Sequence, residues 1–404
     1  MLTPLLAELA GLGVKLAVEG DQLVMQAPRG VLTAELRGRV MARKPELLLH
    51  LAGPTTRRLD FSLFYFASEA STTPGDPYKL LLDGARYADQ HGFHAVWVPE
   101  RHFHALGGLF PNPAVAAAAL ATVTHRVQLR AGSIVLPLHD PLRVAEEWAM
   151  VDQLSGGRVG LSFASGWHAD DFALAPERYA ERKRHMLEGL ETVRALWRGE
   201  AVERTGGGGR PVSVQTHPRP TRPSPPIWLT AVTSAETFVL AGEHGCNVLT
   251  CLLGQEPEEL AAKIAAYRAA RAAHGHDAGR VTCMVHAYLG DDLATVKARV
   301  RRPFSRYLEN TLDLVANLAR GVGAGLDPAS LPAAEREALL EHAFERYWRT
   351  AALLGTPASV RPLVDQLAAM GVDELGCLVD FGLEADEVMA GLGRLAALQL
   401  AVSK

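Results

Sequence analysis

The sequence has few cysteines, no excess of basic residues and no long apolar run, and each shortage excludes a class of protein. Its four cysteines form no CxxC pair and no zinc-ligand spacing, so we expect small core residues in a reducing compartment. The formal net charge of -4 argues against a nucleic-acid-binding domain, which would normally be basic. No stretch reaches the ~18 uninterrupted apolar residues that a membrane span needs. We therefore expect neither nucleic acid nor a membrane as a partner.

Several functional motifs are also missing. Residues 1–10 contain an acid, Glu8, and no basic start, so the sequence predicts no signal peptide and a cytoplasmic protein. No GxGxxG follows an early strand, and Ser165 in FASGW does not stand in a GxSxG elbow. His102 and His104 are two apart on an expected loop and lack a carboxylate–histidine set of zinc spacing. The sequence thus predicts neither a serine hydrolase nor a metal site.

The first 52 residues predict a small αββα unit. An amphipathic helix ends at Gly11, and VKLAVEGDQLVMQAP alternates across the turn dipeptide Gly20–Asp21. A second helix follows Thr33, a plausible N-cap. Basic residues outnumber acidic ones here, which suits an interaction module as well as a solvated helix face. Residues 53–59 supply the Gly, Pro and polar residues of a linker.

Residues 60–404 alternate short apolar strands with helices, the pattern of an α/β protein. Eight such strands predict a closed (β/α)8 TIM barrel, and a doubly wound open sheet is the alternative. GGGGR at 206–210 lacks a strand-to-helix context and is interpreted as a loop, and residues 293–350 predict a helical insertion. The expected strands are 61–66, 95–99, 127–136, 158–164, 226–231, 246–251, 281–289 and 374–381.

Polar side chains follow several of these strands, and the carboxyl ends of barrel strands form the rim where active sites lie. Glu100, Arg101 and His102 follow the second strand. His102 is a candidate donor or acid, because imidazole titrates near neutral pH, and the alternative is a rim histidine without a catalytic role. Arg101 has the alternative of pairing with Glu100. Further candidates at this rim are Ser133, Ser165, Gly166, Trp167 and Thr230.

The segment TAVTSAET combines a strand end with a helix start. Thr233 and Glu236 fit a capping box, which by itself predicts no more than a well-capped helix. At a barrel rim, however, free backbone N–H groups together with the hydroxyls of Ser234 and Thr237 would suit a phosphate group. The two interpretations stay open at this point.

Longer motifs now become recognisable. VWVPERHFHALGGLFPNPAVAAAALA, IVLPLHDPLRVAEEWAMVDQLSGGR and LLGTPASVRPLVDQLAAMGVDEL resemble the bacterial luciferase family of flavin-dependent monooxygenases. Within that family the chain looks most like the branch associated with nonribosomal peptide and polyketide assembly lines. Independently, APRGVLTAELRGRVMARKPELL resembles the docking domains that begin tubulysin-type synthetase subunits.

The family resemblance implies a barrel, usually dimeric, that binds reduced FMN from a separate reductase and reacts it with O2. His102 matches the second histidine of the family's Glu-His-His-Phe pattern. Arg101 replaces the first, a reactive histidine in true luciferases, so light emission is not expected. Ser133 matches the position beneath the flavin ring, and the resemblance implies a cis bond at Gly132–Ser133 or Ser133–Ile134.

The resemblance also implies phosphate contacts. Ser234 and Thr237 match family positions that contact the FMN phosphate, and Ser165 stands where luciferase has a phosphate-contacting arginine. Arg182 or Arg184 would supply the missing cation. Trp167 and His168 would border the ring or the substrate.

Together the two resemblances imply a two-component monooxygenase that oxidises, and more specifically hydroxylates, an acyl or aminoacyl group tethered to a carrier protein. The docking unit would hold the partner synthetase close to the enzyme. Two alternatives remain: a deazaflavin-dependent oxidoreductase on the same barrel, and a non-catalytic docking scaffold.

Overall fold

The computed structural model describes residues 8–9, 11–19, 22–28, 30–43, 59–66, 72–104, 106–321 and 332–402. Eight parallel strands close into a barrel, because β13 pairs with β3 and β10 pairs with β11. The predicted barrel is therefore confirmed, and the open sheet is excluded. In ring order the strands are β3 (Asp60–Phe64), β4 (Ala95–Val98), β5 (Gln128–Val135), β6 (Val159–Ala164), β9 (Ile227–Thr230), β10 (Asn247–Cys251), β11 (Val281–Leu289) and β13 (Glu374–Leu378).

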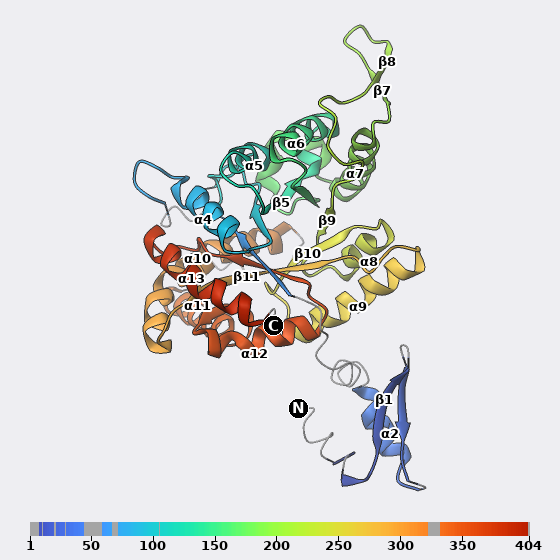
Figure 1. Cartoon of the computed structure of the whole chain (residues 1–404), viewed down its shortest axis with the longest axis vertical. Coiled ribbons are helices and arrows are strands. Elements are labelled where there is room, and N and C mark those ends of the chain that lie inside the picture. Colours follow the sequence, from blue (N-terminus) through green and yellow to red (C-terminus); the bar gives the residue numbers. More distant parts are fainter. Residues whose placement is uncertain are drawn as a thin grey trace.

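Helices follow the strands and cover the outside of the barrel (Figure 1). Their ends carry local signals. Asn112 accepts hydrogen bonds from two backbone N–H groups at the start of α5, and Asp140 caps α6, which ends at the left-handed Gly156. The helices are α4 (Lys79–Gln90), α5 (Pro113–Ala121), α6 (Pro141–Ser155), α7 (Arg182–Arg198), α8 (Ala235–Glu243), α9 (Pro257–Ala273), α12 (Pro357–Ala369) and α13 (Ala385–Val402), with short 3-10 turns η2 (Leu136–Leu138), η3 (Ala169–Leu174) and η4 (Pro176–Arg178).

Glu374 and Arg130 form the centre of a buried charge network inside the barrel. Arg130 donates to Glu374 at 2.6 Å and lies between the rings of Trp97 and Trp228, 4.9 and 4.4 Å from their centroids. Glu374, the first residue of β13, also accepts from Ser62 and Trp97. Arg280, His94 and Asp60 complete this set, which we call the floor network. For Arg130 and Glu374, which have no buried unpartnered atom among the described residues, these hydrogen bonds compensate the cost of burying the charges.

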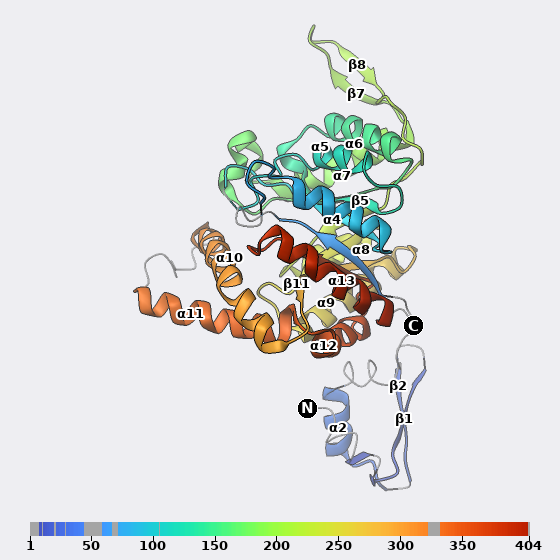
Figure 2. The ribbon, with the colours of Figure 1, turned by 60° about the vertical axis from the view of Figure 1, so that its left-hand side comes forward.

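The segment between β11 and β13 holds the helical insertion. α10 (Leu293–Gly321) and α11 (Ala333–Arg346) pack together and extend from the barrel (Figure 2). A π-helical turn η6 (Tyr347–Ala351) then leads into β12 (Leu353–Gly355), which pairs with the end of β11. Among the described atoms, His286 Nε2 of β11 is buried and has no hydrogen-bond partner. Four rings surround this imidazole, with centroids 4.8 to 5.9 Å away: Phe304, Tyr307, Tyr347 and Phe381.

A β-hairpin interrupts the connection between α7 and β9 and projects from the body in both views (Figures 1 and 2). Its strands are β7 (Val202–Thr205) and β8 (Pro211–Val214), paired antiparallel. The glycine-rich stretch 206–210 forms the tip, which agrees with a loop at these residues. The two strands beside it were missed by the sequence analysis, because each has only four residues and none of them is fully buried, so the alternation is weak.

The N-terminal unit has a hydrophobic cluster of its own. β1 (Lys15–Glu19) and β2 (Gln22–Gln26) form the predicted hairpin, and α2 (Ala34–Ala42) begins at Thr33, whose side chain accepts from Leu36 N–H. The N-cap at Thr33 is thus confirmed. The predicted turn at Gly20–Asp21 and most of the first helix lie outside the described residues. Leu9, Val14, Leu23, Leu36 and Val40 make up this cluster.

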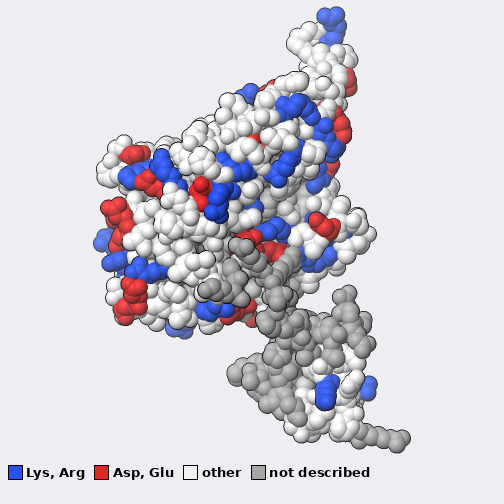
Figure 3. Space-filling view, in the orientation of Figure 1, with Lys and Arg blue, Asp and Glu red and all other residues white. Residues whose placement is uncertain are grey.

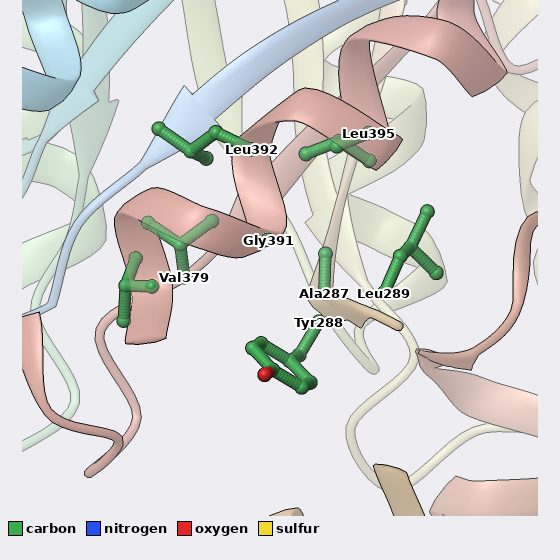
Figure 4. A pocket seen from close by; sticks show the side chains of 8 residues that line it. Ala287, Tyr288, Leu289, Val379, Gly391, Leu392 and Leu395 are labelled. Atoms are coloured by element: carbon green, nitrogen blue, oxygen red, sulfur yellow. The ribbon is translucent and has the colours of Figure 1, made fainter. Parts of the chain in front are cut away.

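A cavity of about 10 Å³, enough for roughly one water molecule, lies between β11 and α13 and has apolar walls that include Tyr288 and Leu392 (Figure 4).

All four cysteines are buried and free, which confirms their predicted place in the core. Among the described helices, none combines the length and the apolar character needed to cross a lipid bilayer.

Candidate active site

The carboxyl ends of β5, β6 and β9 are joined by hydroxyl groups. Thr230 Oγ1 lies 2.5 Å from Ser133 Oγ and 2.8 Å from Ser162 Oγ, so three strands contribute to one hydrogen-bonded group. The Gly132–Ser133 peptide bond is cis, the first of the two predicted positions. Ser133 and Thr230, singled out separately from the sequence, therefore lie together inside the rim.

Glu100 organises the end of β4. Its carboxylate is buried and accepts from the backbone N–H of Val135 at 2.7 Å and from Nε2 of His102 and His139 at 2.8 and 2.6 Å. Burial would raise the pKa of Glu100, but these hydrogen bonds outweigh it and hold the pKa below its ordinary value. Burial would likewise lower the pKa of His139, yet the bond to Glu100 raises it. Glu100 is thus a fixed anion that orients His102.

Arg101 does not pair with Glu100, the alternative considered from the sequence. Its guanidinium is buried, with Nη1 3.4 Å from Asp171 Oδ2 and the Trp167 ring 5.1 Å from its central carbon. Next to it, His104 Nε2 and His168 Nδ1 are 3.3 Å apart, and His168 Nδ1 is 3.6 Å from Asp171 Oδ1. We call Arg101, His104, Trp167, His168 and Asp171 the rim cluster.

The rim cluster is electrostatically strained. Burial, reinforced by the charge of Arg101, lowers the pKa of His168 to about 4, so this imidazole is neutral at pH 7. Burial raises the pKa of the Asp171 carboxyl against the opposing effect of Arg101. Among the described side chains, buried atoms without a hydrogen-bond partner include Arg101 Nε and Nη2 and His168 Nε2. Perturbed, unsatisfied groups of this kind concentrate at functional sites.

The loop after β4 is conformationally strained as well. Phe103 is the one non-glycine residue of the described chain with a positive φ, 59°, and its side chain is 66% exposed. Trp167 is 40% exposed. A bulky residue in this backbone region is uncommon and is found where the surroundings fix it, often at ligand sites. Two large aromatic side chains therefore stand open to solvent at the rim.

The helix start after β9 differs from the sequence prediction by one residue. Ser234, not Thr233, is the N-cap of α8, and its Oγ accepts from the N–H and the hydroxyl of Thr237. The predicted capping box between Thr233 and Glu236 is therefore wrong. Ser234 has the extended backbone of an N-cap, and Glu236 lies in the second helical position, where it pairs with Lys183 at 2.6 Å instead.

The salt bridge between Lys183 and Glu236 brings the first turns of α7 and α8 together. Lys183 was not among the candidates from the sequence, because its neighbourhood depends on two helices 50 residues apart. Arg182 donates to the carbonyl oxygens of Gly166 and Tyr179, which places it beside the loop after β6. Arg184 is exposed and pairs with Glu181, the N-cap of α7, and with Glu188 in α7. Among the described residues, no contact joins it to the Ser234 group.

Residues after β6 depend on a glycine. Gly166 has φ 79°, and a Cβ added there would lie 2.7 Å from the Phe172 ring and 2.8 Å from Val135. Glycine therefore lets the loop approach the barrel closely while Ser165 and Trp167 on either side stay at its mouth. Asp171 follows and reaches back to Arg101, and His168 contacts His104.

Besides Lys183, the sequence analysis missed Ser162, His139 and Asp171, and it considered His104 only as a metal ligand. His139 follows the end of β5 in LPLHDP, so its position after a strand was a usable signal. Asp171 lies in a 3-10 turn whose direction the sequence does not specify. One ligand atom each from His104, His168 and Asp171 lie within 4.8 Å of one another, a spacing that a metal ion could use. The buried guanidinium of Arg101 beside them disfavours a second cation.

The residues present fit a flavin. The site offers unpartnered buried donors on Arg101 and an unpartnered buried ring nitrogen on His168, together with the hydroxyls of Ser133 and Thr230. A Cβ at Gly132 would lie 2.9 Å from the Phe64 ring, so the backbone there approaches its neighbours as only glycine allows. A planar ring with polar edges and a phosphate tail matches such a set.

Comparisons with known proteins agree with this geometry. Residues 58–374 match the family described as "Luciferase-like monooxygenase", and residues 3–52 match the "TubC N-terminal docking domain". The oxygenase component of flavin-dependent trigonelline monooxygenase from Acinetobacter baylyi is 27% identical over 346 residues, covering 83% of this chain and 93% of its own length.

Solved structures give the same fold. The monooxygenase RslO1 from Streptomyces bottropensis superposes with a TM-score of 0.68 at 25% identity, covering 85% of this chain and 99% of its own. The oxygenating constituent of 3,6-diketocamphane monooxygenase from Pseudomonas putida, in complex with FMN, has a TM-score of 0.66 at 18% identity and covers 86% and 98%. The predicted family, barrel and flavin dependence are confirmed: the chain belongs to the luciferase-like monooxygenase family and is a flavin-dependent monooxygenase that carries a TubC-type docking domain.

Proposed function

We propose that this protein is the oxygenase of a two-component, FMN-dependent system that hydroxylates an acyl or aminoacyl group tethered to a carrier protein. The observation that carries this proposal is the combination of a docking domain and a monooxygenase barrel in one chain. A docking domain raises the local concentration of a synthetase partner, so an enzyme acting on that partner's bound intermediates gains from it. A separate reductase supplies the reduced FMN. The trigonelline relative is likewise the oxygenase component of its monooxygenase.

Each part of the site has a role under this proposal. When bound, FMN supplies the activation of O2. Ser133 and Thr230 contact the ring, and the first turn of α8 with Ser234 and Thr237 receives the phosphate, helped by Lys183. His102, oriented by Glu100, donates a hydrogen bond to the reactants. Trp167 and Phe103 cover the mouth and limit the access of water.

The exposed apolar residues of two neighbouring helices support a homodimer. Val115 on α5 and Met150 and Leu154 on α6 are 67%, 57% and 50% exposed. α5 and α6 pack side by side. On the face shown in Figure 3, Lys and Arg side chains and Asp and Glu side chains are interspersed among uncharged residues. Exposed apolar side chains on adjacent helices are the kind of surface that a second copy covers.

The central experiment incubates acyl-carrier proteins with enzyme, a flavin reductase, NADH and 18O2, and follows the acyl group by mass spectrometry. We expect a gain of one labelled oxygen atom under air and no change without oxygen. Turnover that persists anaerobically would instead support a hydride-transferring oxidoreductase. Failure to bind FMN in either redox state would support the scaffold alternative.

His102→Ala tests the site itself. We expect oxygenation to fall at least 100-fold while FMN affinity changes less than about threefold, because a positioned donor or acid typically contributes that much to rate. Glu100→Gln serves as the matched variant, since it keeps the shape but removes the anion that orients His102. Equal losses of turnover and FMN affinity in His102→Ala would contradict a catalytic role.

Removal of residues 1–55 tests the docking unit. We expect oxidation of a small thioester mimic to be unchanged and oxidation of the carrier-bound substrate to fall at low carrier concentration. A parallel loss of both activities would show that the first unit stabilises the barrel instead.

A further inference from the structure

His286 points into the barrel from β11. On the same strand, Thr282 donates to Glu374 of the floor network and accepts from the indole N–H of Trp228, so its side chain lies inside the barrel. Residues two and four positions apart on a strand share a face. Met284, between the two, is the one residue of β11 that is not buried. The interior just below His286 is therefore open.

Strand register joins His286 to the candidate active site. Its partner on β13 is Leu378, whose partner on β3 is Phe64. The Phe64 ring packs against Gly132, where an added Cβ would lie 2.9 Å from it, and Ser133 follows. In the ring order β11 stands four strands from β5 in either direction. His286 and Ser133 thus belong to opposite walls of one interior space.

The two ring nitrogens of His286 differ in their surroundings. Nε2 is enclosed and has no hydrogen-bond partner among the described atoms. The planes of the four neighbouring rings stand at 67° to 89° to the imidazole. An N–H edge is attracted by the negative face of an aromatic ring, whereas a lone pair there is repelled. The proton of the neutral imidazole therefore resides on Nε2.

Nδ1 is then a hydrogen-bond acceptor that the protein leaves unused. No hydrogen bond joins it to another described residue, and it is not among the enclosed unpartnered atoms, so it shares in the 6% of His286 that remains exposed. Burial alone, with no contribution from a charged neighbour, lowers the pKa of His286 to about 3. A neutral acceptor beside aromatic rings suits an N–H donor, and it tolerates a positive charge on that donor.

We propose that Nδ1 of His286 accepts a hydrogen bond from the amino group of the tethered substrate, so that the enzyme oxidises aminoacyl groups in preference to acyl groups without an amine. This inference rests on the proposed function in taking a carrier-tethered substrate. It assigns to His286 a role in substrate recognition, with the four rings fixing the imidazole. It also explains why the interior keeps a polar ring whose enclosed nitrogen lowers stability.

Matched substrates isolate the amino group. Leucyl- and 4-methylpentanoyl-carrier protein differ only in this group, as do phenylalanyl- and 3-phenylpropanoyl-carrier protein. For the full-length enzyme with reductase, NADH and FMN under air, we expect kcat/KM to be at least ~10-fold higher for the aminoacyl member, the effect of one charge-assisted hydrogen bond. Equal values for the two members of each pair would overturn the proposal.

Three variants locate the preference. His286→Phe keeps a ring among the four aromatic side chains and loses the acceptor, so the ratio of the two kcat/KM values should fall to about 1. His286→Asn places an amide oxygen close to the position of Nδ1 and should recover part of the ratio, and a value no higher than in His286→Phe would contradict the acceptor role. His274→Phe removes an exposed histidine at the C-cap of α9 and should leave the ratio as in the wild type.

Binding is measured apart from turnover with amide-linked leucyl- and 4-methylpentanoyl-pantetheine. The ratio of their two dissociation constants should change in His286→Phe and His286→Asn in the same direction as the ratio of kcat/KM values. A preference for the amine that persists in His286→Phe would overturn this inference and leave the proposed function standing. If no carrier-bound substrate is oxidised under air, the proposed function fails, whereas the binding ratio still decides whether Nδ1 prefers an amine.

Discussion

The floor network and the rim cluster each bury an arginine beside a carboxylate, and they treat that pair in opposite ways. In the floor network Arg130 meets Glu374 at 2.6 Å between two tryptophan rings, and among the described residues neither has a buried unpartnered atom. In the rim cluster Arg101 meets Asp171 at 3.4 Å, and both keep unpartnered atoms. The first pair is complete within the protein, and the second leaves donors for a ligand.

This difference follows the polarity of the barrel. Strand amino ends have no reacting ligand to hold, so charges there pair with one another and serve stability. Loops at the carboxyl ends hold cofactor and substrate, and a site that is preorganised for them carries unsatisfied groups until they bind. Replacing the arginine should therefore lower the free energy of unfolding much more in the floor network than in the rim cluster.

The largest expected effect comes from breaking the floor pair. Arg130→Met should lower the free energy of unfolding by about 3–5 kcal/mol, because it leaves Glu374 buried without its main cation. Arg101→Met, the matched change in the rim cluster, should cost no more than about 1 kcal/mol, since it also removes unpartnered donors. Urea denaturation of the two variants measures both changes in the free energy of unfolding. Equal decreases would contradict the proposed difference between the floor network and the rim cluster.

Acid should reveal the same floor pair. Burial would raise the pKa of Glu374, but Arg130, His94 and Arg280 lower it to about 2, against 4.5 when unfolded. The stabilisation from this carboxylate is then complete above pH 4.5 and is lost as the pH falls through about 2. It amounts to on the order of 3 kcal/mol. Unfolding followed from pH 6 to pH 2 should show this loss, and Glu374→Gln should show a correspondingly smaller pH dependence.

His286 extends the comparison to a third buried polar group. His286→Phe should raise the free energy of unfolding by about 1 kcal/mol at pH 8. The reason is that an apolar phenyl ring then replaces an imidazole whose Nε2 has no hydrogen-bond partner among the four aromatic rings. Burial lowers the pKa of His286 to about 3, so protonation of the unfolded chain destabilises the wild type below pH 6.5. The advantage of the variant should therefore grow from pH 6.5 toward pH 3, and an advantage independent of pH would contradict a buried neutral imidazole.

The smallest effect is expected at the surface. Asp365→Asn breaks a surface salt bridge in which the Arg361 side chain is 43% exposed and the Asp365 side chain 56% exposed. It should change the free energy of unfolding by less than about 0.5 kcal/mol. The same denaturation assay applies. A loss comparable to that of Arg130→Met would show that burial does not set the scale.

Strand positions and the family were accessible from the sequence because they depend on local pattern. Apolar runs such as 61–66 and 281–289 became β3 and β11, and Thr33 became the N-cap it predicted. The capping of α8 was placed one residue early, because Thr233 and Ser234 are both good N-caps and the choice depends on how the chain leaves β9. The roles of Thr233, Ser165 and Arg184 stay predictions.

The sequence by itself determined that this chain is a barrel preceded by a docking unit and that His102, Ser133 and Thr230 belong to its rim, because strand ends share one edge whatever the side chains do. Only the tertiary structure decided which polar side chains pair. These pairs are Glu100 with His102 and His139, Arg101 with Asp171, and Lys183 with Glu236. Those pairs join residues from different loops and helices. Their distances follow from how the elements pack, which no local pattern records.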